Sequence, residues 1–331
     1  MSKAIIFGPW TGEFSYEMSW WAPEIRKIRK GKFLDHYAIH VGYIGRRALY
    51  KDFIDEYVSF PQEIHDSIKY PSMCWTFENG KHVIPQNVQD FFQQTINSKK
   101  QFFDDIKVYL PHNKIPEKIY QDNPFGDYAY IDASDEIKKE VKNRLSKFKD
   151  KKRKVVCINA RFRTRLGQTD YGDWKGEHWG EFIKRLITEL KLNVVIMGVP
   201  KRGDYPGSMT IDDMGNLKKY KDYIMDMVFE GPDSVEYQVA LMQVTDCTIF
   251  GMSAAVNLAF MVDGVQIFTH QSTEHTDRIS FEWQRKLTDN HKRVRIFKKY
   301  KRLEYPDSPP DEVFEDFKDF WQNHVLKLTS K

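Results

Sequence analysis

Residues 248–259, TIFGMSAAVNLA, join a short apolar segment to a run of small residues at helical spacing. A glycine at a strand-to-helix turn, here Gly251, lets the backbone approach a ligand closely. The first N–H groups of the following helix, with the positive end of its dipole behind them, attract anions. The stretch therefore predicts either a phosphate-binding turn or a plain connection of an α/β fold. The residues of the predicted turn are Gly251, Met252, Ser253 and Ala254.

The length and composition of the chain indicate a globular protein. A chain of 331 residues, 41% of them hydrophobic, predicts two globular domains. It contains no run of about 18 apolar residues, so we expect no membrane span. The three cysteines lack the spacing of metal ligands, which favours reduced thiols and a cytoplasmic location. A net charge of +4 permits an anionic partner without requiring one.

The order of predicted elements indicates two α/β domains. In the second half, apolar segments at 154–160, 194–198, 247–250 and 265–268 alternate with helical patterns at 179–190 and 234–244. Such alternation is typical of a parallel sheet covered on both faces. The first half begins with a strand, a helix over 14–29 and a second strand over 36–41, whereas 223–229 fits no element clearly. We place the domains at 1–150 and 151–305, facing each other across a cleft. We expect the amphipathic helix in 306–331 to cross back to the first domain.

Three arginines, Arg161, Arg163 and Arg165, alternate just after the strand that ends near residue 160. Guanidinium groups match phosphate oxygens with two hydrogen bonds each. The alternative is a solvated edge with ordinary ion pairs to Asp170 and Asp173. Because ligands bind beyond the carboxyl ends of parallel strands, we expect Arg161 and Arg163 to hold a diphosphate together with the Gly251 turn.

Several known motifs are missing from the sequence. It has no Gly-x-x-x-x-Gly-Lys-Ser/Thr, no Gly-x-Gly-x-x-Gly after a strand and no His-Glu-x-x-His. His178 and His270 stand alone, and a lone histidine is usually structural. We therefore expect no metal and no bound cofactor.

The second half, over about 154–270, resembles the nucleotide-binding domain of GT-B glycosyltransferases, above all heptosyltransferases, with features of fucosyltransferases. Residues 173–182, DWKGEHWGEF, are similar to the Trp-containing turn that opens a helix in this family. Gly251 to Ser253 with Ala259 resembles its Ser/Thr-Gly-x-x-His-x-x-Ala phosphate turn, although Ala254, Ala255 and Asn257 stand near the place of the histidine. Arg161 and Arg163 resemble the His-x-Arg-Arg stretch of fucosyltransferases.

The resemblance implies a GT-B fold of two facing Rossmann-like domains and a donor that is a nucleotide sugar. We expect a UDP- or GDP-linked sugar, and an adenosine diphosphate sugar fits the sequence as well. The strand and loop at 194–201 are similar to the family's nucleotide-contacting segment. The residues expected at the base and ribose are Gly198, Val199, Lys201 and Glu230.

The first turn of the first domain carries the candidate base. Heptosyltransferases have Gly-Asp there, and Gly12-Glu13 occupies the matching place in this sequence. A carboxylate at a helix start is held ionised by the dipole, which suits a base that takes a hydroxyl proton. Glu17 lies one turn later and is the second candidate. The residues expected to contact the acceptor are Trp10, Thr11, Gly12, Tyr16 and Arg46.

We expect transfer of a sugar from a nucleotide diphosphate donor to a hydroxyl, with inversion and without a metal. Three interpretations of the acceptor stay open. A hydroxymethylated pyrimidine in duplex DNA fits the basic side chains of the first half, a surface polysaccharide or lipopolysaccharide fits the heptosyltransferase resemblance, and a non-catalytic nucleotide-binding module would need no acceptor. We take DNA first, because its phosphates would be contacted by basic residues. Those residues are Arg46, Arg47, Lys51, Lys69, Lys99 and Lys100.

Overall fold

The computed structural model describes residues 2–69, 71–72, 74–78, 80–112, 128–165, 168–169, 172–201, 207–215, 217–253, 255–276 and 293–329. Its contacts divide the chain into a first unit, Met1–Ala129 with Gly231–Val235, and a second unit, Tyr130–Glu230 with Glu236–Lys331. The change of unit comes before the predicted boundary at residue 150, because helix α5 (Asp135–Leu145) belongs to the second unit. The predicted cleft between the two halves stays a prediction.

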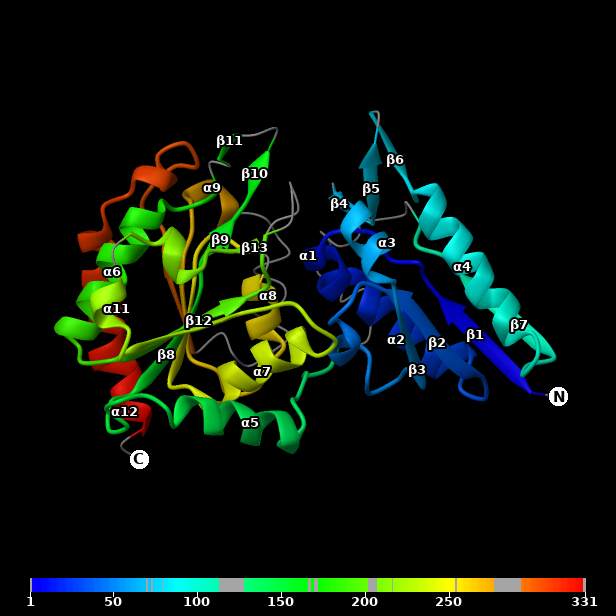
Figure 1. Ribbon diagram of the computed structural model, residues 1–331, viewed down its shortest axis with the longest axis horizontal. Helices are drawn as coiled ribbons and strands as arrows, with labels where there is room; N and C mark the ends of the chain where they lie inside the picture. Colours follow the sequence, from blue (N-terminus) through cyan, green and yellow to red (C-terminus); the bar gives the residue numbers. More distant parts are fainter. Residues whose placement is uncertain are drawn as a thin grey trace. The chain divides into compact units, whose positions relative to one another are not determined.

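The first unit is built on a parallel four-stranded sheet in the order β3-β2-β1-β7 (Figure 1). Four of the five residues of β1 are buried, so both faces of this strand are covered, as its continuous apolar run predicts. The strands are β1 (Lys3–Phe7), β2 (Tyr37–Gly42), β3 (Glu56–Ser59) and β7 (Asp105–Tyr109). The other elements are α3 (Gln62–Ser67), α4 (Gln86–Lys99) and the antiparallel strands β4 (Pro71–Ser72), β5 (Trp75–Glu78) and β6 (Lys81–Val83).

One continuous helical run follows β1, as predicted, but it contains a π turn. The run consists of α1 (Phe14–Tyr16), the π segment Glu17–Trp21 and α2 (Ala22–Lys32). Pro23 lacks an N–H and cannot donate to the carbonyl of Ser19, which explains a wider turn at this point. The Ser19 carbonyl instead accepts a hydrogen bond of 2.6 Å from the Tyr128 hydroxyl.

The second unit has a parallel six-stranded sheet in the order β14-β12-β8-β15-β16-β17. Counted along the chain, this is the 3-2-1-4-5-6 order of doubly wound dinucleotide-binding folds. The α/β class with parallel sheets is confirmed, and residues 223–229 contain strand β14. The strands are β8 (Val155–Asn159), β12 (Asn193–Gly198), β14 (Ile224–Val228), β15 (Cys247–Phe250), β16 (Ile267–His270) and β17 (Val294–Phe297).

Helices and short strands complete the second unit. Its helices are α5, α6 (Gly176–Thr188), α7 (Ser234–Val244), α8 (Ala255–Phe260), α9 (Thr273–Thr276), α11 (Pro310–Phe320), a π segment (Trp321–Val325) and α12 (Leu326–Thr329). Short antiparallel pairs join β9 (Arg161–Phe162) to β13 (Gly207–Ser208) and β10 (Thr164–Arg165) to β11 (Gln168–Thr169). Among the described residues, none of the helices has the length and apolar composition needed to cross a membrane.

Helix α11 packs on the sheet of the second unit. Its buried face includes Phe317, whose ring lies 5.2 Å from that of Phe268 in β16 and 5.8 Å from that of Phe182 in α6. The predicted amphipathic helix is thus present and covers the core of its own unit. Its predicted crossing to the first unit stays a prediction.

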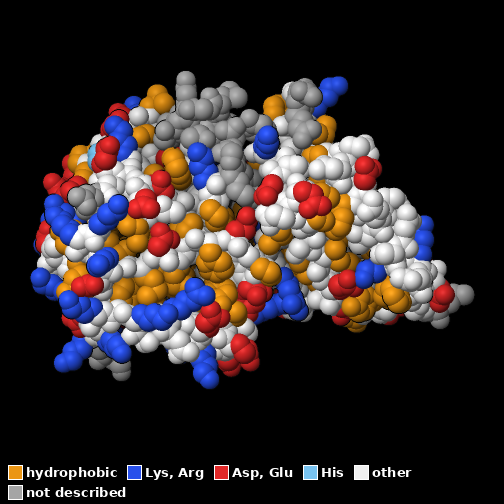
Figure 2. Space-filling model, viewed as in Figure 1, with side chains coloured by type: hydrophobic (Ala, Val, Ile, Leu, Met, Phe, Trp, Pro, Cys, Tyr) orange, Lys and Arg blue, Asp and Glu red, His pale blue; other side chains and the backbone are white. Residues whose placement is uncertain are grey.

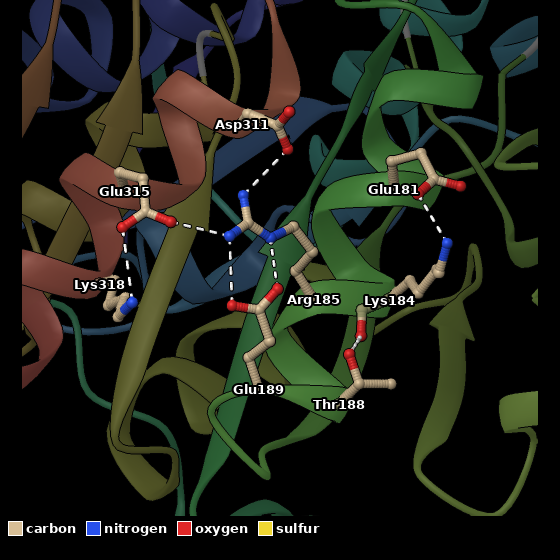
Figure 3. Close-up of polar contacts among 8 residues, drawn as sticks. All are labelled: Glu181, Lys184, Arg185, Thr188, Glu189, Asp311, Glu315 and Lys318. Atoms are coloured by element: carbon tan, nitrogen blue, oxygen red, sulfur yellow. Dashed lines mark hydrogen bonds and ion pairs between the residues drawn. The ribbon is translucent and has the colours of Figure 1, made fainter.

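A charged network on the surface joins α6 to α11 (Figure 3). The Arg185 guanidinium contacts Glu189 at 2.5 Å, Glu315 at 2.7 Å and Asp311 at 2.9 Å. It also lies over the ring of Phe314 at 3.8 Å. Because only 20% of the Arg185 side chain is exposed, these contacts are partly shielded from water and salt.

Replacing this arginine tests how much the network stabilises α11. We expect Arg185→Met to lower the free energy of unfolding by about 1–2 kcal/mol, from the lost ion pairs and the lost cation–π contact. Urea unfolding followed by circular dichroism measures the change, which should shrink at high salt. Lys184→Met is the matched control, because Lys184 pairs with the exposed Glu181 on the same helix. Equal stability of the Arg185 variant and the wild type would contradict the expectation.

Candidate functional site

The sheet order of the second unit places its candidate site at the carboxyl ends of β8 and β15. These strands are neighbours at the point where the strand order reverses, and ligands of open α/β sheets bind outside such a point. Arg161 follows β8 closely, and Gly251 follows β15 directly. The Gly251 N–H donates a hydrogen bond of 3.3 Å to the Asn159 carbonyl. The structure thus brings the two predicted segments together.

Arg161 is held by a buried carboxylate. Its Nη1 lies 3.5 Å from Oδ1 of Asp173, whose side chain is only 1% exposed, whereas the Arg161 side chain keeps 15% exposure. A Cβ at Gly172 would lie 1.9 Å from Nη1, so a larger residue at this position would displace the guanidinium. Asp173, named above as an ion-pair partner, does pair with Arg161, while Asp170 lies outside the described residues.

The same carboxylate fixes the backbone at Arg163. Oδ2 of Asp173 accepts a hydrogen bond of 2.6 Å from the Arg163 N–H. Asp173 therefore orders the whole segment after β8 and offsets part of the positive charge of Arg161. Sequence reasoning named this aspartate but gave it no positioning role.

The Gly251 turn differs in detail from the expectation. The Met252 N–H donates at 2.9 Å to the hydroxyl of the buried Tyr305, and the Ser253 hydroxyl accepts at 3.1 Å from the Ala255 N–H. Both groups are engaged within the protein, and Ala254 lies outside the described residues. Helix α8 has six residues, so few peptide dipoles add up behind the turn. An anion at this edge would therefore depend chiefly on Arg161.

The predicted base and ribose residues lie at the same edge of the sheet, at the end of β12 and in the segments after β12 and β14. Gly198 has φ of +143°, and a Cβ there would lie 1.8 Å from the Ser208 hydroxyl. That hydroxyl accepts a hydrogen bond of 3.0 Å from the Asn159 amide, which joins β8 to the loop after β12. Val199 and Glu230 are half-buried, and the Lys201 ammonium lies 4.6 Å from the centre of the Phe162 ring.

The first turn of the first unit is buried more deeply than the sequence suggests. Trp10 is 0% exposed, and its ring stacks on Trp21 at 5.5 Å. Thr11 is also 0% exposed, and its carbonyl accepts a hydrogen bond of 2.8 Å from the Tyr43 hydroxyl. Core packing buries both side chains, and their expected contact with an acceptor stays a prediction. Gly12 is buried and Tyr16 is half-buried.

Glu17 and Arg46 form a buried ion pair. Glu17 is 0% exposed, contacts the Arg46 guanidinium and accepts a hydrogen bond of 2.6 Å from the Tyr50 hydroxyl. Burial raises the pKa of Glu17, while Arg46 and Tyr50 act in the opposite direction. The guanidinium also lies 4.2 Å from the ring centre of Tyr43. These contacts make both side chains part of the core, and their expected roles at the site stay predictions.

Glu13 is the less buried member of the predicted carboxylate pair. It is half-buried, has extended backbone angles of −68° and 147°, and precedes the helical run as its N-cap. Its carbonyl accepts a hydrogen bond of 3.0 Å from the Glu17 N–H. Glu13 is therefore placed at a helix start, where the dipole favours the carboxylate form.

The comparisons with known proteins show the fold. No family model and no curated protein sequence matches this chain. The solved structure of the ADP-heptose LPS heptosyltransferase II of E. coli is similar, with a TM-score of 0.57 and 13% identity over 99% of this chain and 100% of that chain. A glycosyl transferase family 9 protein from Veillonella parvula DSM 2008 gives a TM-score of 0.53 and 10% identity, covering 98% and 97% of the two chains. The fold of this chain is thus that of GT-B glycosyltransferases.

Removing the arginine of the buried ion pair should give a pH-dependent loss of stability. In Arg46→Met, the pKa of Glu17 in the folded state should rise further above its ordinary value of 4.5. Above pH 4.5 the unfolded chain releases the Glu17 proton, whereas the folded protein keeps it until the pH passes the raised pKa. The free energy of unfolding therefore falls as the pH rises between these two pKa values. We expect a loss of about 3–5 kcal/mol at pH 7 that shrinks toward pH 4.5.

Urea unfolding at a series of pH values measures this effect. Arg47→Met is the control, because the neighbouring Arg47 is exposed and should change stability little at any pH. A loss in Arg46→Met that is the same at pH 7 and at pH 4.5 would show that Glu17 is not the group left uncompensated.

Proposed function

We propose that this protein is a glycosyltransferase that moves a sugar from a nucleoside diphosphate donor to a hydroxyl of a glycan. The observation that carries the proposal is the position of Arg161, at the switch point of a 3-2-1-4-5-6 sheet within a GT-B fold. A guanidinium held in place by a buried carboxylate is preorganised to receive phosphate oxygens.

The second unit is the proposed donor-binding half. Arg161 binds the diphosphate, with Arg163 and the Gly251 turn at its side. Gly198, Val199, Lys201 and Glu230, which lie after β12 and β14, border the base and ribose. The E. coli heptosyltransferase, by its title, uses ADP-heptose, so ADP is the first nucleotide to try beside UDP and GDP.

Glu13 of the first unit is the proposed general base. The acceptor hydroxyl gives its proton to the Glu13 carboxylate while its oxygen bonds to the anomeric carbon. The bond from that carbon to the diphosphate breaks, and its electron pair leaves on the phosphate oxygen, where Arg161 offsets the growing negative charge. Attack by a single step of this kind inverts the anomeric centre.

The basic side chains of the first unit favour a glycan acceptor over DNA. Arg46 is buried against Glu17, and the Lys99 ammonium is paired with Glu56 at 2.6 Å. Both side chains were expected to contact DNA phosphates, and both are paired with carboxylates of the first unit instead. Figure 2 shows basic and acidic side chains interspersed over the visible face, which is not the arrangement of a polyanion-binding surface.

Thermal unfolding with nucleotides tests the donor site. One of ADP, UDP and GDP, at 100 times its dissociation constant, should raise the free energy of unfolding by about 2.7 kcal/mol. Arg161→Ala should lose this stabilisation, because the remaining contacts lack the fixed cation. Arg144→Ala, on the exposed face of α5 in the same unit, is the control and should respond like the wild type. The donor proposal fails if none of the nucleotides stabilises the wild type.

Replacing the base should separate chemistry from donor binding. Glu13→Gln should lower the transfer rate by about 10²–10⁴-fold and leave the nucleotide-induced stabilisation intact. Glu63→Gln, an exposed site on α3, is the control. Transfer is followed with a labelled nucleotide sugar and either lipopolysaccharide or hydroxymethylated duplex DNA. Salt-sensitive transfer to DNA would replace the glycan acceptor, and full activity of Glu13→Gln would remove Glu13 from the mechanism.

A further inference from the structure

Three further polar side chains meet at the carboxyl edge of the sheet in the first unit. Glu24 lies in the first turn of α2, Tyr109 ends β7, and His112 follows three residues later. Oε1 of Glu24 lies 2.6 Å from the Tyr109 hydroxyl and 3.1 Å from Nε2 of His112. β1 and β7 are neighbours at the point where the strand order of this sheet reverses, so the cluster lies where α/β sheets bind ligands.

The Tyr109 hydroxyl donates to Glu24, and burial together with this bond raises the pKa of Tyr109. Nε2 of His112 lies 3.0 Å from the Tyr109 hydroxyl and 3.1 Å from Oε1 of Glu24. Because the tyrosine proton goes to Glu24, we assign the ring proton of His112 to Nε2, which leaves the lone pair of a neutral ring on Nδ1. The carboxylate thus orients the histidine.

Two acceptor atoms of the cluster are left over. Oε2 of Glu24 and Nδ1 of His112 have no hydrogen-bond partner among the described residues, although both atoms are buried and Glu24 is only 8% exposed. A buried acceptor without a donor is costly, and most native proteins avoid it. The His112 side chain keeps 36% exposure, so the cluster borders solvent on the histidine side.

We propose that Glu24 and His112 form the acceptor-binding site, and that they bind two neighbouring hydroxyl groups of a sugar. Each hydroxyl donates one hydrogen bond, one to Oε2 of Glu24 and one to Nδ1 of His112. A carboxylate and a lone pair match such donors and repel phosphate, so the ligand is a neutral polyol and not a nucleic acid backbone. This inference rests on the proposed function and names the acceptor side of the same reaction.

Saturation-transfer NMR with the full chain tests the site. The probe is methyl α-D-mannopyranoside, which has neighbouring hydroxyls, and the comparison compound is 2-(hydroxymethyl)tetrahydropyran, which has the ring but no such pair. We expect the wild type to bind the mannoside and not the comparison compound. Glu24→Gln and His112→Gln should each weaken binding about tenfold or more, because each loses one hydrogen bond to a charged or oriented acceptor.

Two further variants keep the test decisive. Tyr109→Phe retains the ring and removes the hydroxyl that orients Glu24, so it should weaken binding without loss of the fold. Lys107→Gln, on the same strand but exposed, should bind like the wild type. Equal binding by the Glu24 and His112 variants and the wild type, or no binding of the mannoside by the wild type, overturns the inference.

Nucleotide affinity separates this inference from the proposed function. Glu24→Gln and His112→Gln should keep the full thermal stabilisation by the nucleotide that stabilises the wild type. If that stabilisation is present but the mannoside does not bind, the acceptor site is wrong and the donor site stands. If no nucleotide binds the wild type, the proposed function falls by itself.

Discussion

A hydrogen bond from the Met252 N–H to the Tyr305 hydroxyl ties the turn after β15 to a distant part of the chain. The same hydroxyl donates at 3.3 Å to the carbonyl of His270, the last residue of β16. Tyr305 lies a few residues before α11, whose apolar face closes the core over α6 and β16. The edge of the sheet that would receive a donor is therefore fixed from behind by the segment leading to the C-terminal helix. The Tyr305 hydroxyl, far along the chain, accepts the hydrogen bond of the Met252 N–H and so restrains the turn.

In the first unit, a buried ion pair also links segments that are distant in the sequence. Glu17 and Arg46 neutralise each other in the core, with the Tyr50 hydroxyl on the second carboxylate oxygen. A buried ion pair adds little net stability, but removing one partner leaves an expensive uncompensated charge. The pair thus fixes how the helical run sits against the loop after β2. The pair bears only indirectly on the proposed proton transfer. With Glu17 engaged in the core, Glu13 at the start of the run is the half-buried carboxylate.

Patterns within short windows predicted most elements, whereas long-range contacts decided the site. Continuous apolar runs identified β1, β8, β12 and β15, because strands of a parallel sheet are buried on both faces. Strand β14 lies at the edge of its sheet, has only Ile224 and Met227 fully buried, and was not recognised. Arg161 and Asp173 were visible as a pair of opposite charges. The capture of the Met252 amide by Tyr305, and the burial of Trp10 among Trp20 and Trp21, depend on packing that no local pattern contains.

The buried Asp173 explains why the proposed donor site would turn over instead of trapping its product. Two uncompensated arginines would bind the nucleoside diphosphate product at least as tightly as the substrate, and binding the two states equally does not speed the chemical step. Asp173 lowers the net charge at Arg161 and lies 3.5 Å from its Nη1, so the guanidinium has a charged partner on one side. Attraction then depends on how well an oxygen aligns with the fixed N–H groups, and charge that develops on the leaving phosphate oxygen gains most from that alignment. Orientation, and not the number of positive charges, is what this arrangement supplies.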